Sequence, residues 1–301
     1  MRIAITDSGV GGLAVCADVE ARLRREPPGE PVELLYLNAA LEDDYSYNAM
    51  PTREEQLRTF DNFLHAAAER YRPDLLFIAC NTLSVLFRDP WFDAHRGTPI
   101  LGIVEAGQRE LEAAWHADTQ AGIILFATPT TIEDGSYARH LHELGMPDRQ
   151  IAEQACPGLP DAISNDASGA LATELLQRFV PAALAQFDSP PTRVAAFLGC
   201  THYGYQAATF ERELKTTVDA VQILNPNRRA GRMIADEIAR RSGGSSDAAG
   251  TVTIRFVSRY AVPDAPLQSL PRYLGASAPA TVAALQRFEH VAFFHGAAPG
   301  G

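Results

Sequence analysis

Two short stretches that resemble each other decide the fold of this chain: FIACNT at residues 77–82 and FLGCTH at residues 197–202. Each is an apolar run that predicts a buried strand, and each ends in a small residue, a cysteine and two polar side chains. Such runs are typical of the core strands of a parallel sheet, where ligands bind beyond the carboxyl ends of the strands. We therefore expect Cys80 and Cys200 to lie where chemistry takes place.

Two further strand-like runs precede these stretches at equal distances. One leads into Asp7 and the other into Ala127, and the same 73 positions separate Asp7 from Cys80 and Ala127 from Cys200. The equal spacing and the matching local chemistry indicate an internal duplication. We expect two similar α/β lobes, each with a cysteine at a strand end, that face one another across a cleft.

Composition narrows the class of protein. The 301 residues suit one large domain or two modest ones, and 46% hydrophobic and 21% charged residues are ordinary for a globular protein. A net charge of −11 argues against a nucleic-acid-binding surface. Met1 runs directly into the first strand, and no uncharged run is long enough to span a bilayer. The four cysteines show no CxxC pair, so we expect a cytoplasmic protein with reduced thiols. Because no run could span a bilayer, we expect no membrane partner.

Periodicity and chain-breaking residues predict the other elements. Helices are expected at residues 13–25, 53–71, 105–114, 137–144, 168–187, 205–214 and 228–241. Further strands are expected at residues 32–37, 99–104 and 221–224, with an edge strand at 251–260. Residues 38–51 are interpreted as a functional loop, 156–160 as a loop rich in Pro and Gly, 242–250 as a flexible insert and 297–301 as a disordered tail.

The two cysteines allow two kinds of chemistry. A thiolate is a good base and a good nucleophile, but it needs help to form at neutral pH. One cysteine paired with His202 would suggest acyl transfer through a thioester. Two opposed cysteines suggest that one removes a proton from carbon and the other returns it on the opposite face, which inverts a stereocentre without a cofactor. Neighbouring hydroxyl and amide groups would then bind an α-carboxylate, and Asp7 would hold the α-ammonium.

Three segments carry a resemblance to a known family. Residues 7–13, 79–82 and 199–203 resemble the signatures of the cofactor-independent aspartate/glutamate racemase family, and the glutamate-specific branch is the most similar. Further matches at residues 99–107, 127–137 and 155–157 follow in family order. Together these matches cover most of the chain and are specific, whereas any one alone is weak.

The resemblance implies a fold and an activity. It implies two pseudo-symmetric parallel-sheet α/β lobes, with the active site in the cleft between them. The second lobe, residues 99–208, would be inserted into a first lobe made of residues 1–98 and 209–301. The implied activity is interconversion of L- and D-glutamate, a small-molecule amino-acid substrate, without a cofactor or metal. The family also implies a homodimer that supplies D-glutamate for peptidoglycan.

The same resemblance implies roles for individual residues. Cys80 and Cys200 would be the two bases, each serving one enantiomer, with Asp7 and His202 assisting them. Residues implied in holding the amino acid are Ser8, Asn81, Thr82 and Thr201, joined by Tyr47 and Asn48 in the loop and by Thr128, Thr130 and Thr131 at a strand end.

The chain departs from the family around the substrate side chain. Ser46-Tyr47-Asn48-Ala49-Met50 stands where glutamate racemases usually carry Pro-Tyr-Gly-x-Arg, and Asn48 would crowd the close approach that a glycine permits. A family Glu is missing near Ser164 unless Asp166 replaces it, and the family's Tyr-Pro is Tyr203-Gly204. Aspartate or another amino acid is therefore an alternative substrate. A racemase-fold binding protein with little turnover is the alternative class.

Simpler interpretations compete at several positions. Cys16 and Cys156 are interpreted as small buried hydrophobic residues. The glycine-rich turn at residues 9–12 lacks the spacing of a nucleotide-binding loop. Glu42, Asp43 and Asp44 fit a solvated acidic loop better than a metal site. Tyr47 either lines the pocket or only packs, and His202 is favoured as functional because it follows Cys200.

Overall fold

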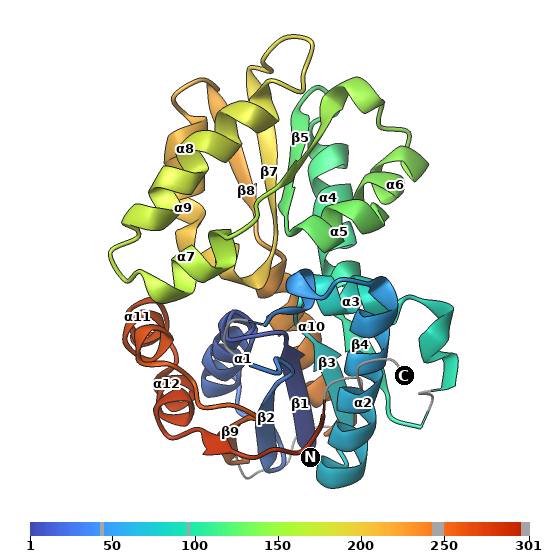
Figure 1. Ribbon diagram of the computed structural model, residues 1–301, viewed down its shortest axis with the longest axis vertical. Helices are drawn as coiled ribbons and strands as arrows, with labels where there is room; N and C mark the ends of the chain where they lie inside the picture. Colours follow the sequence, from blue (N-terminus) through green and yellow to red (C-terminus); the bar gives the residue numbers. More distant parts are fainter. Residues whose placement is uncertain (43–44, 95–96, 243–249, 296–301) are drawn as a thin grey trace.

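The computed structural model describes residues 1–42, 45–94, 97–242 and 250–295. This part of the chain forms two α/β lobes stacked along the long axis of the molecule, each built on a parallel sheet (Figure 1). The predicted fold class is confirmed. The expected flexible insert lies mostly outside the described residues, and so do Asp43, Asp44 and the expected tail. In the described part, no helix is long and apolar enough to cross a membrane.

Each lobe has one sheet whose neighbouring strands run parallel. The six-stranded sheet contains, in spatial order, β10 (Glu289–His290), β9 (Val252–Ser258), β2 (Val32–Asn38), β1 (Arg2–Asp7), β3 (Leu75–Ile78) and β4 (Ile100–Gly102). The four-stranded sheet contains β6 (Ile151–Ala155), β5 (Gly122–Ala127), β7 (Arg193–Gly199) and β8 (Ala220–Leu224). The order β2-β1-β3-β4 in the first sheet matches β6-β5-β7-β8 in the second, which supports the predicted duplication.

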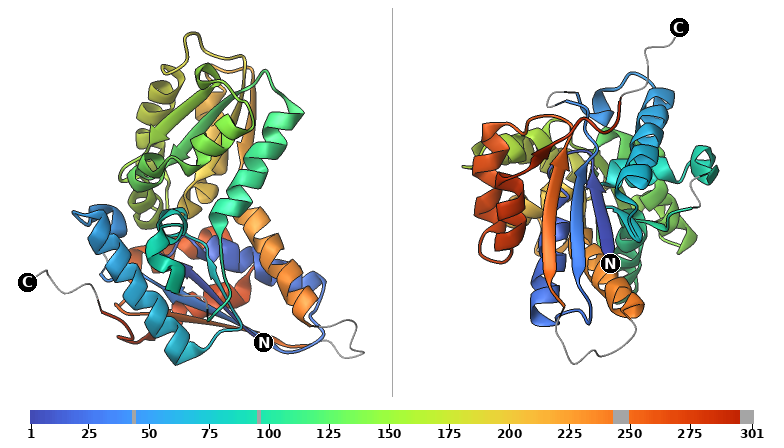
Figure 2. Two further views of the ribbon diagram at one scale, coloured as in Figure 1. Left: turned by 90° about the vertical axis from the view of Figure 1, so that its right-hand side faces the viewer. Right: turned by 90° about the horizontal axis from the view of Figure 1, so that it is seen from below.

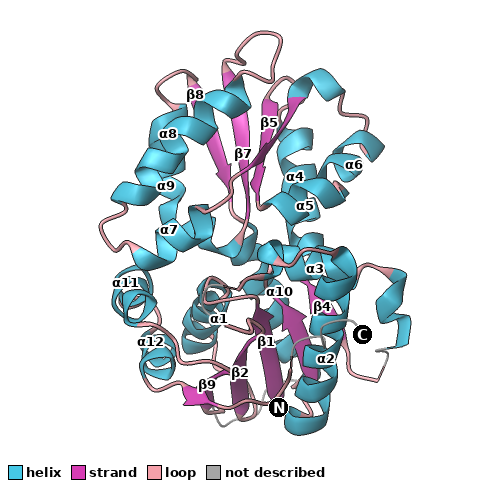
Figure 3. Cartoon of the chain, in the orientation of Figure 1, coloured by secondary structure: helices cyan, strands magenta, loops and turns pink. Residues whose placement is uncertain are grey.

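The strand register brings the chemically important residues to the same edge. Thr6 pairs with Ile78 across β1 and β3, so Asp7 and Cys80 follow the ends of adjacent strands. Ala127 pairs with Gly199 across β5 and β7, so Thr128 and Cys200 do the same in the other lobe. The strands of both sheets point toward the junction of the lobes (Figure 3). The two sheets therefore place their carboxyl ends opposite one another.

Helices cover both faces of each sheet (Figure 2). One face of the six-stranded sheet packs on α1 (Leu13–Arg25), α10 (Pro226–Arg241), α11 (Asp264–Leu274) and α12 (Pro279–Gln286), and the other packs on α2 (Arg53–Tyr71) and α3 (Asn81–Phe87). One face of the four-stranded sheet packs on α7 (Leu159–Asn165), α8 (Ala170–Leu184) and α9 (Ala207–Leu214), and the other packs on α4 (Ile103–Ala117) and α6 (Ser136–Glu143). The short elements are α5 (Pro129–Asp134) and the 3-10 helices η1 (Tyr47–Ala49), η2 (Pro90–Ala94), η3 (Asp148–Gln150) and η4 (Thr201–Gln206). Burial on both faces explains why the core strands read as continuous apolar runs.

The predicted helices at residues 13–25 and 53–71 are confirmed with the same bounds. The expected lobe borders differ from the membership of the sheets. β4 belongs to the first sheet and β8 to the second, so the chain crosses between lobes through α4 and then through α10, rather than at residues 99 and 209. The prediction of an edge strand at 251–260 is wrong, because β9 pairs with β2 on one side and β10 on the other.

A buried carboxylate fixes α12 against the first lobe. Glu20, on α1, is 2% exposed. It accepts hydrogen bonds from the Thr281 backbone N–H and hydroxyl, both at 2.8 Å, and from the Ala280 N–H at 3.0 Å. These donors lie in the first turn of α12, whose N–H groups have no partners within the helix. Glu20 therefore satisfies the start of α12 from another element.

We expect Glu20→Ala to lower the free energy of unfolding by roughly 2–3 kcal/mol, because it leaves buried donors without an acceptor. Glu26→Ala, at an exposed position after α1, is the control and should change it by less than about 0.5 kcal/mol. Urea titration followed by circular dichroism measures both. Equal effects of the two substitutions would contradict this role of Glu20.

Candidate active site

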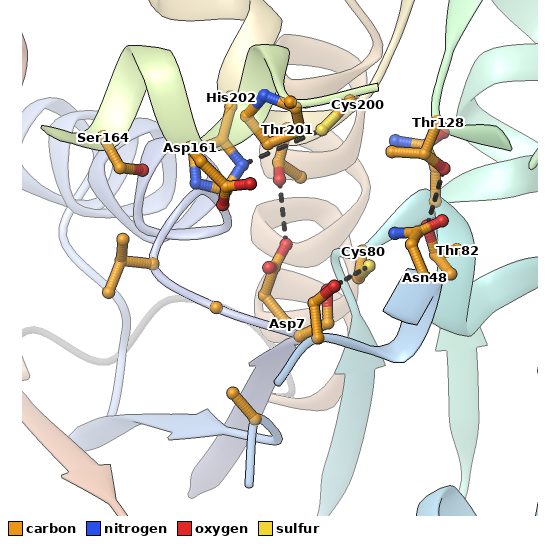
Figure 4. A pocket seen from close by; sticks show the side chains of 18 of the residues that line it. Asp7, Asn48, Cys80, Thr82, Thr128, Asp161, Ser164, Cys200, Thr201 and His202 are labelled. Carbon is orange, nitrogen blue, oxygen red and sulfur yellow. Dashed lines mark hydrogen bonds between the residues drawn. The ribbon is translucent and has the colours of Figure 1, made fainter. Parts of the chain in front are cut away.

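A cavity of about 550 Å³ lies between the carboxyl ends of the two sheets and is lined by residues of both lobes (Figure 4). Ten of the thirteen residues predicted for the site line it: Asp7, Ser8, Asn48, Cys80, Asn81, Thr82, Thr128, Cys200, Thr201 and His202. Residues more than a hundred positions apart in the sequence thus share one cavity. The cavity that they line between the lobes is therefore the candidate active site.

Cys80 stands at the start of α3, directly after β3. Its sulfur lies 3.1 Å from Ser8 Oγ and accepts a hydrogen bond from the Leu83 N–H at 3.5 Å. Burial raises the pKa of the Cys80 thiol to about 12, and the nearby Asp7 carboxyl acts in the same direction. The hydrogen bonds from Ser8 and Leu83 lower it. Cys80 is therefore a neutral thiol at pH 7 in this environment.

Cys200 occupies the equivalent position in the second lobe, between β7 and η4. Its sulfur lies 3.8 Å from His202 Nδ1. Burial raises the pKa of the Cys200 thiol well above its usual range, and Cys80, in its thiolate form, would act in the same direction. Burial also lowers the pKa of His202 to about 4. The imidazole beside Cys200 is therefore neutral at pH 7 and can either donate or accept a hydrogen bond.

Asp7 connects the two lobes inside the cavity. Its Oδ2 accepts a hydrogen bond of 2.9 Å from Thr201 Oγ1 (Figure 4). Burial raises the pKa of Asp7 to about 6, while the bonds from Thr201 and from the N–H groups of Gly9 and Gly12 lower it. The carboxylate is thus ionised at neutral pH, but it titrates close to that range.

The glycine-rich turn lets the lobes approach each other closely. A Cβ at Gly11 would lie 2.4 Å from His202 Nδ1 and 2.5 Å from Thr201 Oγ1, which no side chain permits. Tyr205, in η4, also donates its hydroxyl to the Gly11 carbonyl at 3.3 Å. Close packing against the second lobe therefore accounts for this glycine.

Hydroxyl and amide groups line the wall between α3 and α5. Thr82 Oγ1 and Thr128 Oγ1 lie 2.9 Å apart. Tyr137 donates its hydroxyl to Asn81 Oδ1 at 2.6 Å, which fixes the orientation of that amide. Asn81 Nδ2 is buried without a hydrogen-bond partner among the described residues. It is therefore a donor that a carboxylate in the cavity would satisfy.

Three predicted site residues do not line the cavity. Tyr47 is fully buried against Phe60 and donates its hydroxyl to the Ala39 carbonyl at 3.3 Å, so it packs instead. Thr131 Oγ1 lies 3.0 Å from Thr128 Oγ1, so Thr131 forms a hydrogen bond with a hydroxyl group that lines the cavity without lining it itself. The Thr130 N–H donates to Asn48 Oδ1 at 3.4 Å, so these residues connect the loop of one lobe to α5 of the other.

Sequence reasoning missed the part of the cavity formed by α7. Asp161, Ser164 and Cys156 line the cavity, whereas residues 156–160 were expected to be a loop. Pro160 in the first turn of α7 was the available signal, because proline is common where helices begin. The suggestion that Asp166 replaces the missing Glu is wrong. Asp166 is partly exposed and does not line the cavity; it accepts hydrogen bonds from the Ser168 hydroxyl and from the Leu171 and Ser168 N–H groups, which hold its pKa at about 2.

The C-terminal part of the chain also reaches the site. Tyr260 and Pro266 line the cavity, although neither was predicted to. Ser269, in α11, donates to the Ser164 carbonyl and so joins α11 to α7. The segment after β9 lacks the apolar run and polar ending that mark the other strand ends, so the sequence offers no comparable signal for it.

Comparison with known proteins identifies the family of this chain. Residues 9–228 match the Asp/Glu/Hydantoin racemase family. The chain is 30% identical to a glutamate racemase from Lysinibacillus sphaericus over 203 residues, which cover 67% of this chain and 69% of the relative. It is 25% identical to a glutamate racemase from Aquifex aeolicus over 245 residues, covering 81% and 86%.

Solved structures of similar proteins have the same fold. Glutamate racemase from Bacillus anthracis matches with a TM-score of 0.68 at 24% identity, covering 92% of this chain and 95% of that one. The enzyme from Francisella tularensis, in complex with D-glutamate, matches with a TM-score of 0.68 at 20% identity, covering 97% of both chains. The family match spans well over half of the sequence, and so this protein belongs to the Asp/Glu/hydantoin racemase family and is a racemase.

Proposed function

We propose that the protein interconverts L- and D-glutamate by moving a proton at Cα between Cys80 and Cys200, without a cofactor. The observation that carries this proposal is the presence of two thiols at equivalent strand ends of opposite lobes, both lining one cavity. The cavity is large enough for a small amino acid. The names of the relatives support glutamate as the substrate.

In the proposed reaction each step moves one proton. One cysteine, as thiolate, removes the Cα proton and becomes a thiol. The opposing thiol gives its own proton to the other face of the carbanion and becomes a thiolate. The atoms balance, the stereocentre is inverted, and the two cysteines have exchanged protonation states. The reverse reaction starts from the other cysteine, so each thiol serves one enantiomer.

The surrounding groups would help to form the thiolate. Burial raises the pKa of both thiols, so a positive charge is needed nearby when substrate binds. The α-ammonium of an amino acid brings that charge and would pair with ionised Asp7. Neutral His202 lies next to Cys200 and would accept its proton or return it. Asn81 Nδ2, the Thr82 hydroxyl and Ser8 would hold the α-carboxylate.

The cavity also supports a second candidate substrate. Three carboxylate side chains line it, those of Asp7, Glu42 and Asp161, and no described lining residue is Lys or Arg. A side-chain carboxylate would depend on hydroxyl and amide donors. Asn48, where the family usually has glycine, is directed to Thr130, and the Glu that the family carries near Ser164 is missing. Aspartate or another amino acid, racemised by the same mechanism, is therefore the second candidate.

Three further parts of the proposal rest on other grounds. The family resemblance supports our proposals that the D-glutamate enters peptidoglycan synthesis and that the protein assembles as a homodimer. The cysteine pattern supports the proposal that it works in the cytoplasm. Sedimentation equilibrium checks the dimer directly.

We expect Cys80→Ser and Cys200→Ser each to lower kcat/KM for racemisation by at least about 10³-fold in both directions, because each removes one of two obligatory proton carriers. Circular dichroism of the amino acid measures the rate. With an analogue that carries a leaving group at Cβ, each variant should still eliminate it from one enantiomer, because elimination needs a single proton removal.

Cys156→Ala is the matched control, since this third thiol lines the same cavity but donates to the Gln154 carbonyl. It should keep kcat/KM within about 10-fold of the wild type. Normal racemisation by either serine variant would remove that cysteine from the mechanism. Elimination from the same enantiomer by both would contradict the assignment of one thiol to each face.

We also expect kcat/KM to rise as the pH increases through about 6, because Asp7 must be ionised to pair with the substrate ammonium and its pKa is raised to about 6. Below that pH the carboxyl is protonated and the rate should fall about tenfold per pH unit. Rates measured between pH 5 and 8 avoid titration of glutamate itself. Asp7→Asn should be slower and should lack this acid limb, and an unchanged limb would assign it to another group.

A further inference from the structure

The hydroxyl of Tyr137 reaches from the second lobe to a residue of the candidate active site. Tyr137 lies on α6, and Asn81 is the first residue of α3 in the other lobe. The hydroxyl donates to Asn81 Oδ1 at 2.6 Å, and the two residues are only 3% and 2% exposed. Asn81 lines the cavity between the thiols, whereas Tyr137 does not. Any effect of the Tyr137 hydroxyl on a bound molecule would therefore pass through Asn81.

The core of the second lobe holds the Tyr137 ring in place. The centroid of the ring lies 4.6 Å from that of Phe197, in β7. A Cβ at Gly107, in α4, would lie 2.7 Å from Tyr137 Cε1 and 2.9 Å from the hydroxyl oxygen. The ring thus occupies the space that a side chain on α4 would need. This packing keeps the hydroxyl in contact with Asn81.

The Tyr137 hydroxyl determines which end of the Asn81 amide remains for a ligand. Burial raises the pKa of Tyr137 above its usual range, so the phenol keeps its proton and stays a donor. The oxygen of an asparagine amide is its acceptor, and the nitrogen is its donor. Asn81 Oδ1 is therefore turned to Tyr137. Asn81 Nδ2, at the other end of the amide, is buried without a hydrogen-bond partner among the described residues.

The fixed amide gives the cavity a direction. Ionised Asp7 is an acceptor and would pair with the α-ammonium of an amino acid, whereas Asn81 Nδ2 is a donor and would bind its α-carboxylate. A hydrogen bond to a charged acceptor is stronger than one to a neutral acceptor. If the Asn81 amide were reversed, its oxygen would attract the ammonium as well. Two orientations of the amino acid would then compete in the cavity.

We propose that Tyr137 is a positioning residue that keeps the donor end of the Asn81 amide available to the substrate, and that the site therefore requires a free α-carboxylate. The inference rests on the proposed function for the kind of molecule that binds, an amino acid, but not for proton transfer. It defines the substrate class as free amino acids and excludes their α-amides and α-esters as good substrates.

Isothermal titration calorimetry with an acid and its α-amide tests this role. Glutamate is paired with isoglutamine, and aspartate with isoasparagine. All four ligands are racemic, so turnover does not change their composition. The ratio of the two dissociation constants is taken within one protein, so a general loss of stability affects both values alike.

Three variants separate the role of the hydroxyl from that of packing. Tyr137→Phe removes only the hydroxyl. Tyr47→Phe is the matched control, because the Tyr47 hydroxyl is also buried but donates to the Ala39 carbonyl, and neither residue lines the cavity. Asn81→Asp replaces the donor by an acceptor and provides a test that does not depend on folding of the Phe variant.

We expect the wild type and Tyr47→Phe to bind at least one acid about tenfold or more tightly than its α-amide, because the charged acceptor is lost in the amide. In Tyr137→Phe the Asn81 amide can turn, and this ratio should fall at least about fivefold. In Asn81→Asp it should fall at least as far. These changes with no exchange of the Cα hydrogen would contradict the proposed racemisation but support the role of Tyr137.

A wild-type ratio in Tyr137→Phe, or an equal fall in Tyr47→Phe, would overturn the role of Tyr137. An unchanged ratio in Asn81→Asp would show that the Asn81 donor does not bind the carboxylate. Equal binding of acid and α-amide by the wild type, or binding of neither acid, would overturn the requirement for a free α-carboxylate.

Discussion

The hydrogen bond from Thr201 to Asp7 is the contact on which the site depends, because it joins the two lobes at the centre of the cavity. It brings the end of β1 against the start of η4. Burial of Asp7 is unfavourable for its charged form, and for this reason the pKa of Asp7 is raised. Thr201 and the N–H groups of the glycine-rich turn offset part of it. The absence of a side chain at Gly11 permits this approach, so the turn, the carboxylate and the second lobe form one unit.

The repeated strand order gives the protein two similar strand ends that meet head to head. The settings of the two thiols nevertheless differ. Cys80 is contacted by a hydroxyl and a backbone N–H, whereas Cys200 has an imidazole beside it. An amino acid held between them would meet different helpers on its two faces.

Much of this arrangement could be predicted from the sequence, because each strand end combines an apolar run with an abrupt change to polar residues. That signal located Asp7, Cys80, Thr128 and Cys200, and the equal spacing indicated the repeat. It does not define where the lobes begin and end. β4 and β8 are short, and the sheet to which each belongs is decided by tertiary pairing with β3 and β7. Local sequence contains no information about that choice.

Side-chain direction was harder to predict than position. Tyr47 and Asn48 are neighbours in one short helical turn, but Tyr47 packs into the apolar core while Asn48 reaches toward the other lobe. Asp161 was not predicted as a site residue, because the prolines and glycine just before it suggested a loop. Gly158 and Pro160 instead lie at the start of α7. Tyr260 and Pro266 reach the cavity because α11 packs on α7, a contact between distant parts of the chain.

The most direct test of the central claim is the exchange of the Cα hydrogen with solvent. Wild-type protein without added cofactor is incubated in D₂O with L- or D-glutamate, and with aspartate in parallel, and proton NMR follows the Cα signal. The account predicts that glutamate loses its Cα proton to deuterium as it racemises, starting from either enantiomer. Exchange with aspartate alone would keep the mechanism and contradict the substrate. Tight binding of glutamate with no exchange of any amino acid would contradict proton transfer at Cα and leave a binding protein.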